Sequence, residues 1–153
     1  VIKIRNISNK IVARTFYAAD FIFAAIDAQT YEKHTAKFTG GNREGSLRER
    51  LLHAVEQHAI GYEESRNVFL SAQITRWTSE VLRKNYQRDM SRLRKDLENW
   101  LPELKSLSPQ RREAVDCAAS FETWHRLHEH QHQSVEASID IVYDMIKALM
   151  TAP

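Results

Sequence analysis

Apolar residues recur at intervals of three and four along most of this chain, whereas residues that make turns are scarce. The clearest run lies between residues 79 and 101 and contains Val81, Leu82, Tyr86, Met90, Leu93, Leu97 and Trp100. This spacing places side chains on one face of an α-helix. The 153 residues include four glycines and three prolines, too few for the turns of an all-β chain of this length. The sequence therefore predicts an all-α fold.

The best candidate boundary in the chain is the segment 38–45, which holds three of the four glycines. We expect a helix over 19–37 before it, so that residues 1–37 form one part of the protein and residues 46–153 another. The first part begins with a basic stretch: residues 1–16 contain four cationic side chains and no acid, and the remaining residues hold 18 basic and 20 acidic side chains. Such a stretch fits either a polyanion-binding surface or a solvated arm.

Start and stop signals divide the second part into helices. Ser46 and Glu49 match a capping box, and Gly61 is expected to end or kink the helix that follows. A second helix is expected over 63–74 and a third over 79–101, where Pro102 stops it. Helices over 109–130 and 134–150 follow, with Ser-Pro at 108–109 and Ser134 as their starts.

Two composition features bear on the compartment. The single cysteine, Cys117, excludes an intramolecular disulfide and a cysteine-based zinc cage, and its Ala-rich surroundings predict a small buried thiol. No stretch approaches the roughly 20 apolar residues that span a bilayer. We therefore expect a cytoplasmic protein without membrane contact.

The tract from His125 to His132 contains four of the seven histidines and could bind a metal. Two Glu-x-x-His spacings, starting at Glu122 and Glu129, resemble half-motifs of diiron bundles, but both fall on one helix and cannot face one cavity. A polar helix end, where histidine is favoured by the helix dipole, explains the tract better. No other catalytic pattern occurs, so no enzyme activity, metal or cofactor is predicted.

Two other patterns indicate surfaces for binding. Aromatic residues that follow the glycine boundary lie near polar side chains, which fits either a plain core or a ligand cavity. The last predicted helix carries Val135, Ile139, Val142, Ile146 and Leu149 in one stripe, with a second stripe beside it. An apolar arc this wide needs partners on two sides, either inside a monomer or across the two-fold axis of a dimer.

Two segments read together resemble the TetR/AcrR family of transcriptional repressors. Residues 7–26 (ISNKIVARTFYAADFIFAAI) are similar to the family's recognition helix and the helix after it. Residues 119–127 (ASFETWHRL) and 133–137 (QSVEA) are similar to its Ser-Phe-Glu-x-Trp helix and the start of its last helix. The resemblance implies a three-helix DNA-binding head, a connecting helix over 19–37 and a helical regulatory body whose last two helices form a dimer.

The resemblance also implies sites. Contacts to operator DNA would come from Ser8, Asn9, Lys10, Arg14 and Tyr17. A small hydrophobic effector would be bound by Tyr62, Phe69, Trp77, Tyr86, Met90, Trp100, Phe121, Trp124 and His125. The homodimer interface would contain Phe121, His128, Val135, Ile139, Val142, Ile146 and Leu149.

The sequence departs from the family pattern in its head. Only six residues precede Ile7, so the family's first helix and most of its second are expected to lie outside this sequence. Ala13 replaces the usual Tyr, and Ala18-Ala19 replaces the usual Ser-Lys pair, which predicts fewer contacts to phosphate. The prediction is a repressor that leaves its operator when effector binds. The alternatives are a helical metal or redox protein that uses the histidine tract and a helical dimerisation module without a cavity.

Overall fold

The computed structural model describes residues 43–77 and 79–151, and the predicted head therefore lies outside the described residues. Within the described part every regular element is helical. The elements are α2 (Leu47–Thr75), α3 (Glu80–Trp100), a 3₁₀ turn (Pro102–Ser106), α4 (Pro109–Ala118), α5 (Phe121–His125), a π-helical turn (Arg126–His130) and α6 (Val135–Thr151). The prediction of an all-α fold is confirmed.

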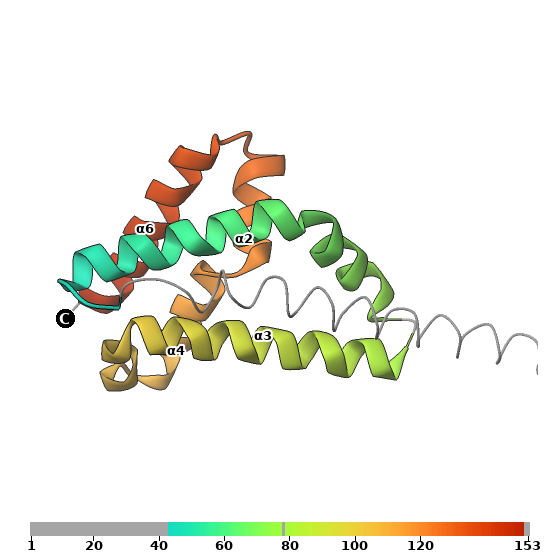
Figure 1. The fold of residues 1–153 in the computed structure, drawn as a ribbon, viewed down its shortest axis with the longest axis horizontal. Helices are drawn as coiled ribbons and strands as arrows, with labels where there is room; N and C mark the ends of the chain where they lie inside the picture. Colours follow the sequence, from blue (N-terminus) through green and yellow to red (C-terminus); the bar gives the residue numbers. More distant parts are fainter. Residues whose placement is uncertain (1–42, 78, 152–153) are drawn as a thin grey trace, which may run out of the picture.

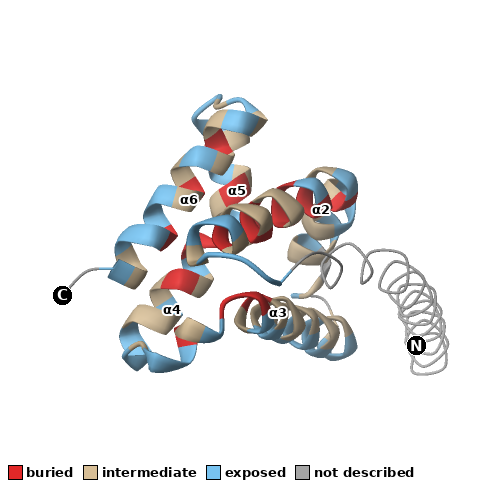
Figure 2. Cartoon of the chain, turned by 60° about the vertical axis from the view of Figure 1, so that its left-hand side comes forward, coloured by how far each residue is buried: buried red, intermediate tan, exposed pale blue. Residues whose placement is uncertain are grey.

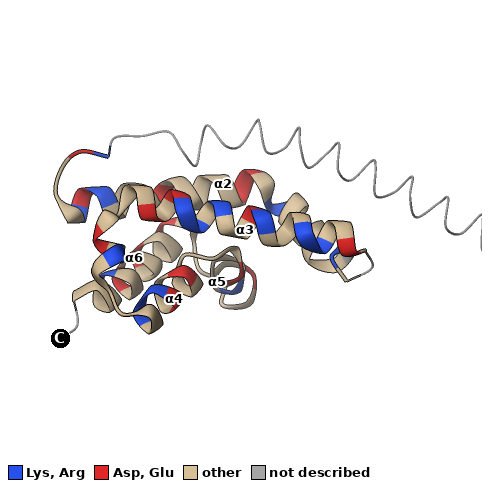
Figure 3. Cartoon of the chain, turned by 90° about the horizontal axis from the view of Figure 1, so that it is seen from below, with Lys and Arg blue, Asp and Glu red and all other residues tan. Residues whose placement is uncertain are grey.

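The helices form two layers. The antiparallel pair α2 and α3 makes one layer, and α4, α5 and α6 make the other (Figures 1 and 3). The main core lies between them and holds fully buried side chains such as Leu51, Leu101 and Ile146. Figure 2 shows that burial follows α2 and the end of α3 near Trp100, whereas the rest of α3 is partly or fully exposed.

Most predicted helix starts are confirmed because each depends on residues within one turn. Ser46 and Glu49 make both bonds of the capping box, with Oγ of Ser46 accepting from the Glu49 amide at 3.3 Å. Ser79 and Ser108 cap α3 and α4, and Pro109 occupies the first turn of α4. The hydroxyl of Ser134 accepts from the Ala137 amide at 3.2 Å in the first turn of α6.

Two predicted helix boundaries were wrong. Gly61, which was expected to end or kink its helix, does not end it: α2 has 29 residues in all and runs through Gly61, with the buried side chains of Ala59 and Tyr62 on either side. This packing outweighs the cost of about 1 kcal/mol that glycine adds inside a helix. The predicted helix 109–130 is instead broken at Ala119, where α4 ends, and Ser120 caps a new helix through a bond from the Thr123 amide.

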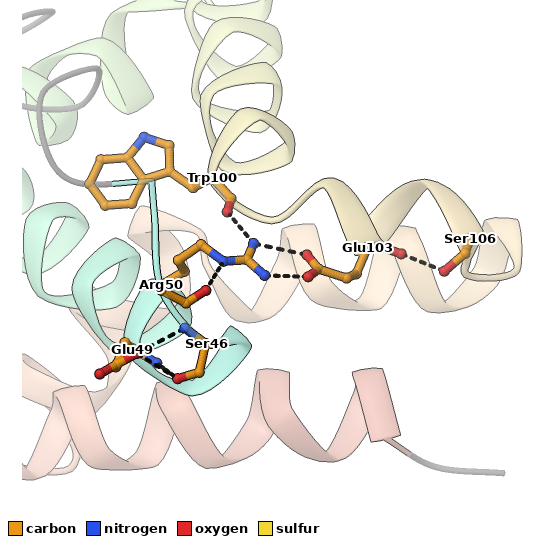
Figure 4. Close-up of polar contacts among 7 residues, drawn as sticks. Ser46, Glu49, Arg50, Trp100, Glu103 and Ser106 are labelled. Carbon is orange, nitrogen blue, oxygen red and sulfur yellow. Dashed lines mark hydrogen bonds and ion pairs between the residues drawn. The ribbon is translucent and has the colours of Figure 1, made fainter.

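The start of α2 is tied to the end of α3 by one cation. Arg50 donates to the carbonyl of Trp100 at 2.9 Å, and both carboxylate oxygens of Glu103 accept from it (Figure 4). Its Nε donates to the carbonyl of Gly45 at 3.2 Å. The guanidinium thus satisfies a backbone carbonyl at the C-terminal end of α3 and fixes the layer at that end.

Candidate ligand-binding site

A pocket of about 310 Å³ opens between the two layers, where α2 and α3 face α4 and the start of α5. Its apolar wall consists of Met90, Leu93, Leu97 and Ala119. The polar groups that line it are His58, Tyr62, Tyr86, Arg94, Asp116, Cys117, Ser120 and Glu122. An apolar wall with a few converging polar groups is typical of a small-molecule site, and the volume lies at the lower end of the usual range.

The segment Ser120–Trp124 contributes Ser120 and Glu122 to one side of this pocket, and its other side chains stabilise the fold around them. Ser120 caps α5, while Phe121 is buried at 1% exposure in an aromatic cluster. The indole of Trp124 donates to Oε1 of Glu63 on α2 at 2.9 Å. Because both flanking aromatic rings point into the protein, Glu122 between them is exposed at the pocket.

Glu122 joins three helices through one oxygen. Its Oε1 accepts from the hydroxyl of Tyr86 on α3 at 2.6 Å and from Nε2 of Gln73 on α2 at 3.0 Å. Partial burial, followed by the bond and the charge of Glu122, raises the pKa of Tyr86 to about 12. The phenol therefore remains a hydrogen-bond donor at neutral pH, and the guanidinium of Arg76 lies 4.4 Å from the centre of its ring.

The inner end of the pocket is closed by two buried polar side chains of α2. The hydroxyl of Tyr62 donates to the carbonyl of Ala119 at 2.7 Å, and burial raises the pKa of Tyr62 well above its usual range. Burial lowers the pKa of His58 to about 4, although a hydrogen bond to the backbone of Ala119 opposes this change. His58 is therefore neutral at pH 7.

The outer side of the pocket carries one cation among carboxylates. Arg94 binds both oxygens of Glu113, at 2.9 and 2.6 Å, and lies 3.9 Å from both Glu98 and Asp116. Burial raises the pKa of Asp116, and the charge of Arg94 partly offsets that rise.

The structure brings together only some of the residues predicted to bind an effector. Tyr62, Tyr86 and Met90 line the pocket. Phe69 and Phe121 pack behind Tyr62 with ring centroids 5.4 and 5.6 Å from it, and His125 stacks on Phe121. The three tryptophans lie elsewhere: Trp124 lines a void of about 10 Å³, Trp100 stacks on His53 at the opposite end of α2, and Trp77 is 75% exposed.

Four of the polar pocket residues, His58, Arg94, Asp116 and Glu122, were not predicted from the sequence. One signal for Arg94 was present, because it follows Tyr86 by eight positions and Met90 by four and therefore shares their helix face. Glu122 lies within residues 119–127, the segment that resembles the family. His58 and Asp116 had no such signal, because their helices meet α3 only in the folded chain.

The prediction that Cys117 is buried was wrong. The thiol is exposed and lines the pocket, because α4 turns its Val115 and Ala118 face to the core instead. An accessible thiol in the pocket provides a chemical probe for any molecule that binds there.

The histidine tract forms ring contacts. His128 stacks on Trp124, and its Nδ1 lies 3.1 Å from the carbonyl of Gln133. The rings of His125 and His130 meet edge to face, and burial, with smaller effects from nearby cations and His130, lowers the pKa of His125. Within residues 43–77 and 79–151 no group of three or more His, Cys, Asp or Glu side chains is arranged to hold a metal.

The predicted dimer stripe divides into two sets. Phe121, Val142 and Ile146 are between 0% and 5% exposed because they are buried in the hydrophobic cores of the chain itself. His128, Val135, Ile139 and Leu149 are partly exposed, as are Ile141 and Tyr143, and Met145 is 41% exposed. The surface that α6 presents thus lies beside the predicted stripe rather than on its centre.

None of the described helices is both long enough and apolar enough to cross a membrane. The residues predicted to contact DNA, Ser8, Asn9, Lys10, Arg14 and Tyr17, lie outside the described part of the chain. Comparisons of the chain with models of known protein families, with curated protein sequences and with solved structures found no match.

Proposed function

We propose that this protein is a DNA-binding transcriptional regulator of the TetR/AcrR type, a repressor that a small molecule releases from its operator. The observation that carries the proposal is the pocket itself. It lies between the two helical layers, and its lining includes Tyr62, Tyr86 and Met90. Ala119, Ser120 and Glu122 of this lining belong to the segment that resembles the family in sequence.

The proposed mechanism couples this pocket to the head. Effector binding between the layers moves residues 19–37, which connect the body to the recognition segment 8–16. In a homodimer two such heads must meet half-sites about 34 Å apart, so a small rotation of each head lowers the affinity for DNA. The coupling is reciprocal, and operator DNA weakens effector binding by the same factor.

The exposed part of α6 supports the homodimer in this proposal. Met145 is 41% exposed on α6, and Ile141 is partly exposed although it also packs against the core; both leave apolar surface for a second copy of the helix. Sedimentation of Met145→Glu is expected to give a monomer where the unchanged protein gives a dimer, because the new charge would be buried at the interface.

DNA binding is tested by selection on the full-length protein. From a random pool of duplexes we expect enrichment of one palindromic sequence, and we expect Lys10→Ala and Arg14→Ala to weaken binding to it. The first change removes a side chain predicted to reach base edges and the second one predicted to reach phosphate. If no sequence is enriched, the proposal is wrong.

A second measurement tests the effector. Mass spectrometry of molecules that co-purify with the protein is expected to detect a small organic compound bound in the pocket. Adding it back should lower the affinity for the selected duplex. A compound that binds equally with and without that duplex would overturn the repressor mechanism.

A further inference from the structure

The charges around the pocket are unbalanced. Its lining contains one cationic side chain, Arg94, and two carboxylates, Asp116 and Glu122. Two further carboxylates, Glu98 and Glu113, contact Arg94 from the side. Arg76 lies over the ring of Tyr86 and adds a second cation, so that two cations face four carboxylates. The remaining excess of negative charge favours a cationic ligand over an anionic one.

Arg94 offsets little of this excess for a ligand because carboxylates of the chain itself surround it. Two of its nitrogens bind the two oxygens of Glu113, at 2.9 and 2.6 Å, in the bidentate geometry that guanidinium and carboxylate prefer. Asp116 and Glu98 lie 3.9 Å from the same group. An incoming carboxylate would have to compete with these acids.

The buried polar side chain at the inner end adds no cation. His58 is 8% exposed, and its burial holds its pKa at about 4, so the ring is uncharged at pH 7. Tyr62 beside it is also uncharged and presents a phenol ring.

Glu122 is the carboxylate best placed to meet a cation. Among the described residues no lysine or arginine forms an ion pair with it, and the partners of its Oε1 are the neutral groups of Tyr86 and Gln73. These two bonds hold the carboxylate at the pocket. Met90, Leu93 and Leu97 form an apolar wall on α3.

We infer that the pocket binds an organic cation, with an ammonium group between Glu122 and Asp116 and an apolar part against Met90 and Leu93. The inference rests on the proposed function only in identifying this cation as the effector. Binding itself can be measured without DNA.

Three probes of matched shape test the charge: 3-phenylpropylammonium, 3-phenylpropan-1-ol and 3-phenylpropanoate. We expect calorimetry on the full-length protein to give about tenfold tighter binding of the ammonium than of the other two, the effect of one charged hydrogen bond. The ammonium should also slow the alkylation of Cys117, the single cysteine of the chain, by iodoacetamide.

Isosteric changes locate the site. Glu122→Gln and Asp116→Asn are each expected to weaken ammonium binding about tenfold and to leave binding of the alcohol unchanged. The amide of Glu122→Gln still accepts from Tyr86, so the fold is retained, and thermal unfolding checks this. The control variants Glu80→Gln and Asp144→Asn remove the same charges from exposed positions outside the pocket lining. They should leave the affinity for the ammonium unchanged.

The outcomes separate the inference from the proposed function. Equal or tighter binding of the alcohol or the carboxylate, unaltered ammonium binding in both pocket variants, or no binding of any probe overturns the inference. An ammonium that binds as expected, yet leaves the affinity for the selected duplex unchanged, supports the inference and contradicts the repressor function.

Discussion

The hydroxyl of Tyr86 on α3 donates a 2.6 Å hydrogen bond to the carboxylate of Glu122 on α5, 36 positions later in the chain. This contact links the two layers at the mouth of the pocket. Gln73 of α2 donates to the same oxygen at 3.0 Å, so a single carboxylate connects α2, α3 and α5 there.

The ionisation of Tyr86 reports this contact. The pKa of Tyr86 is raised to about 12 by partial burial and then by Glu122, so Glu122→Gln should lower it toward the usual value near 10. Tyrosinate absorbance measures the change, and the difference between the protein and Tyr86→Phe isolates this phenol from the others. A Tyr86 phenol that titrates near 10 with Glu122 intact would contradict the contact.

Stability at acid pH should depend on His58. Burial lowers its pKa from 6.5 to about 4, so between these values the unfolded chain binds a proton that the folded chain does not. The free energy of unfolding therefore does not depend on the ionisation of His58 above pH 6.5, and it decreases as the pH falls from 6.5 to 4. The total decrease in the free energy of unfolding from this group is about 3 kcal/mol.

Urea unfolding across this pH range measures the dependence. His58→Leu should reduce the slope of the free energy of unfolding against pH, whereas His130→Gln, at an exposed position, should retain it. An unchanged slope in His58→Leu would show that other groups cause the acid sensitivity.

Two serines of one helix should respond to the same substitution in opposite directions. Ser138 is 0% exposed, and its hydroxyl has no hydrogen-bond partner among the described residues, so Ser138→Ala should stabilise the protein by about 0.5 to 1 kcal/mol. Ser134 caps α6 through the Ala137 amide, so Ser134→Ala should cost about 1 kcal/mol. Thermal unfolding of both variants decides the comparison, which fails if Ser138→Ala destabilises more than Ser134→Ala.

The contact between Arg50 and Glu103 should matter more than an exposed ion pair. The Arg50 side chain is 11% exposed and also donates to the carbonyl of Trp100, so Arg50→Met should lower the free energy of unfolding by about 2 kcal/mol. Arg48→Met, at an exposed position on the same helix, serves as the control and should cost far less. Equal effects of the two changes would mean that the bridge between α2 and α3 adds no stability.

The sequence predicted features that depend on residues within one helical turn. The caps at Ser46, Ser108 and Ser134 were predicted because the serine hydroxyl and the amide that donates to it lie three positions apart. The same holds for the class of the fold, since spacing alone places apolar side chains on one face of a helix.

Tertiary structure decided whatever depends on which faces meet. Gly61 remains helical because α2 is packed on both sides of it, and the break at Ala119 lets Phe121 and Trp124 enter the core. The pocket needed Arg94 of α3, Asp116 of α4 and Glu122 of α5 at one place. Local sequence determines that a helix forms and where it is capped, but the burial of a given side chain is set by partners dozens of residues away.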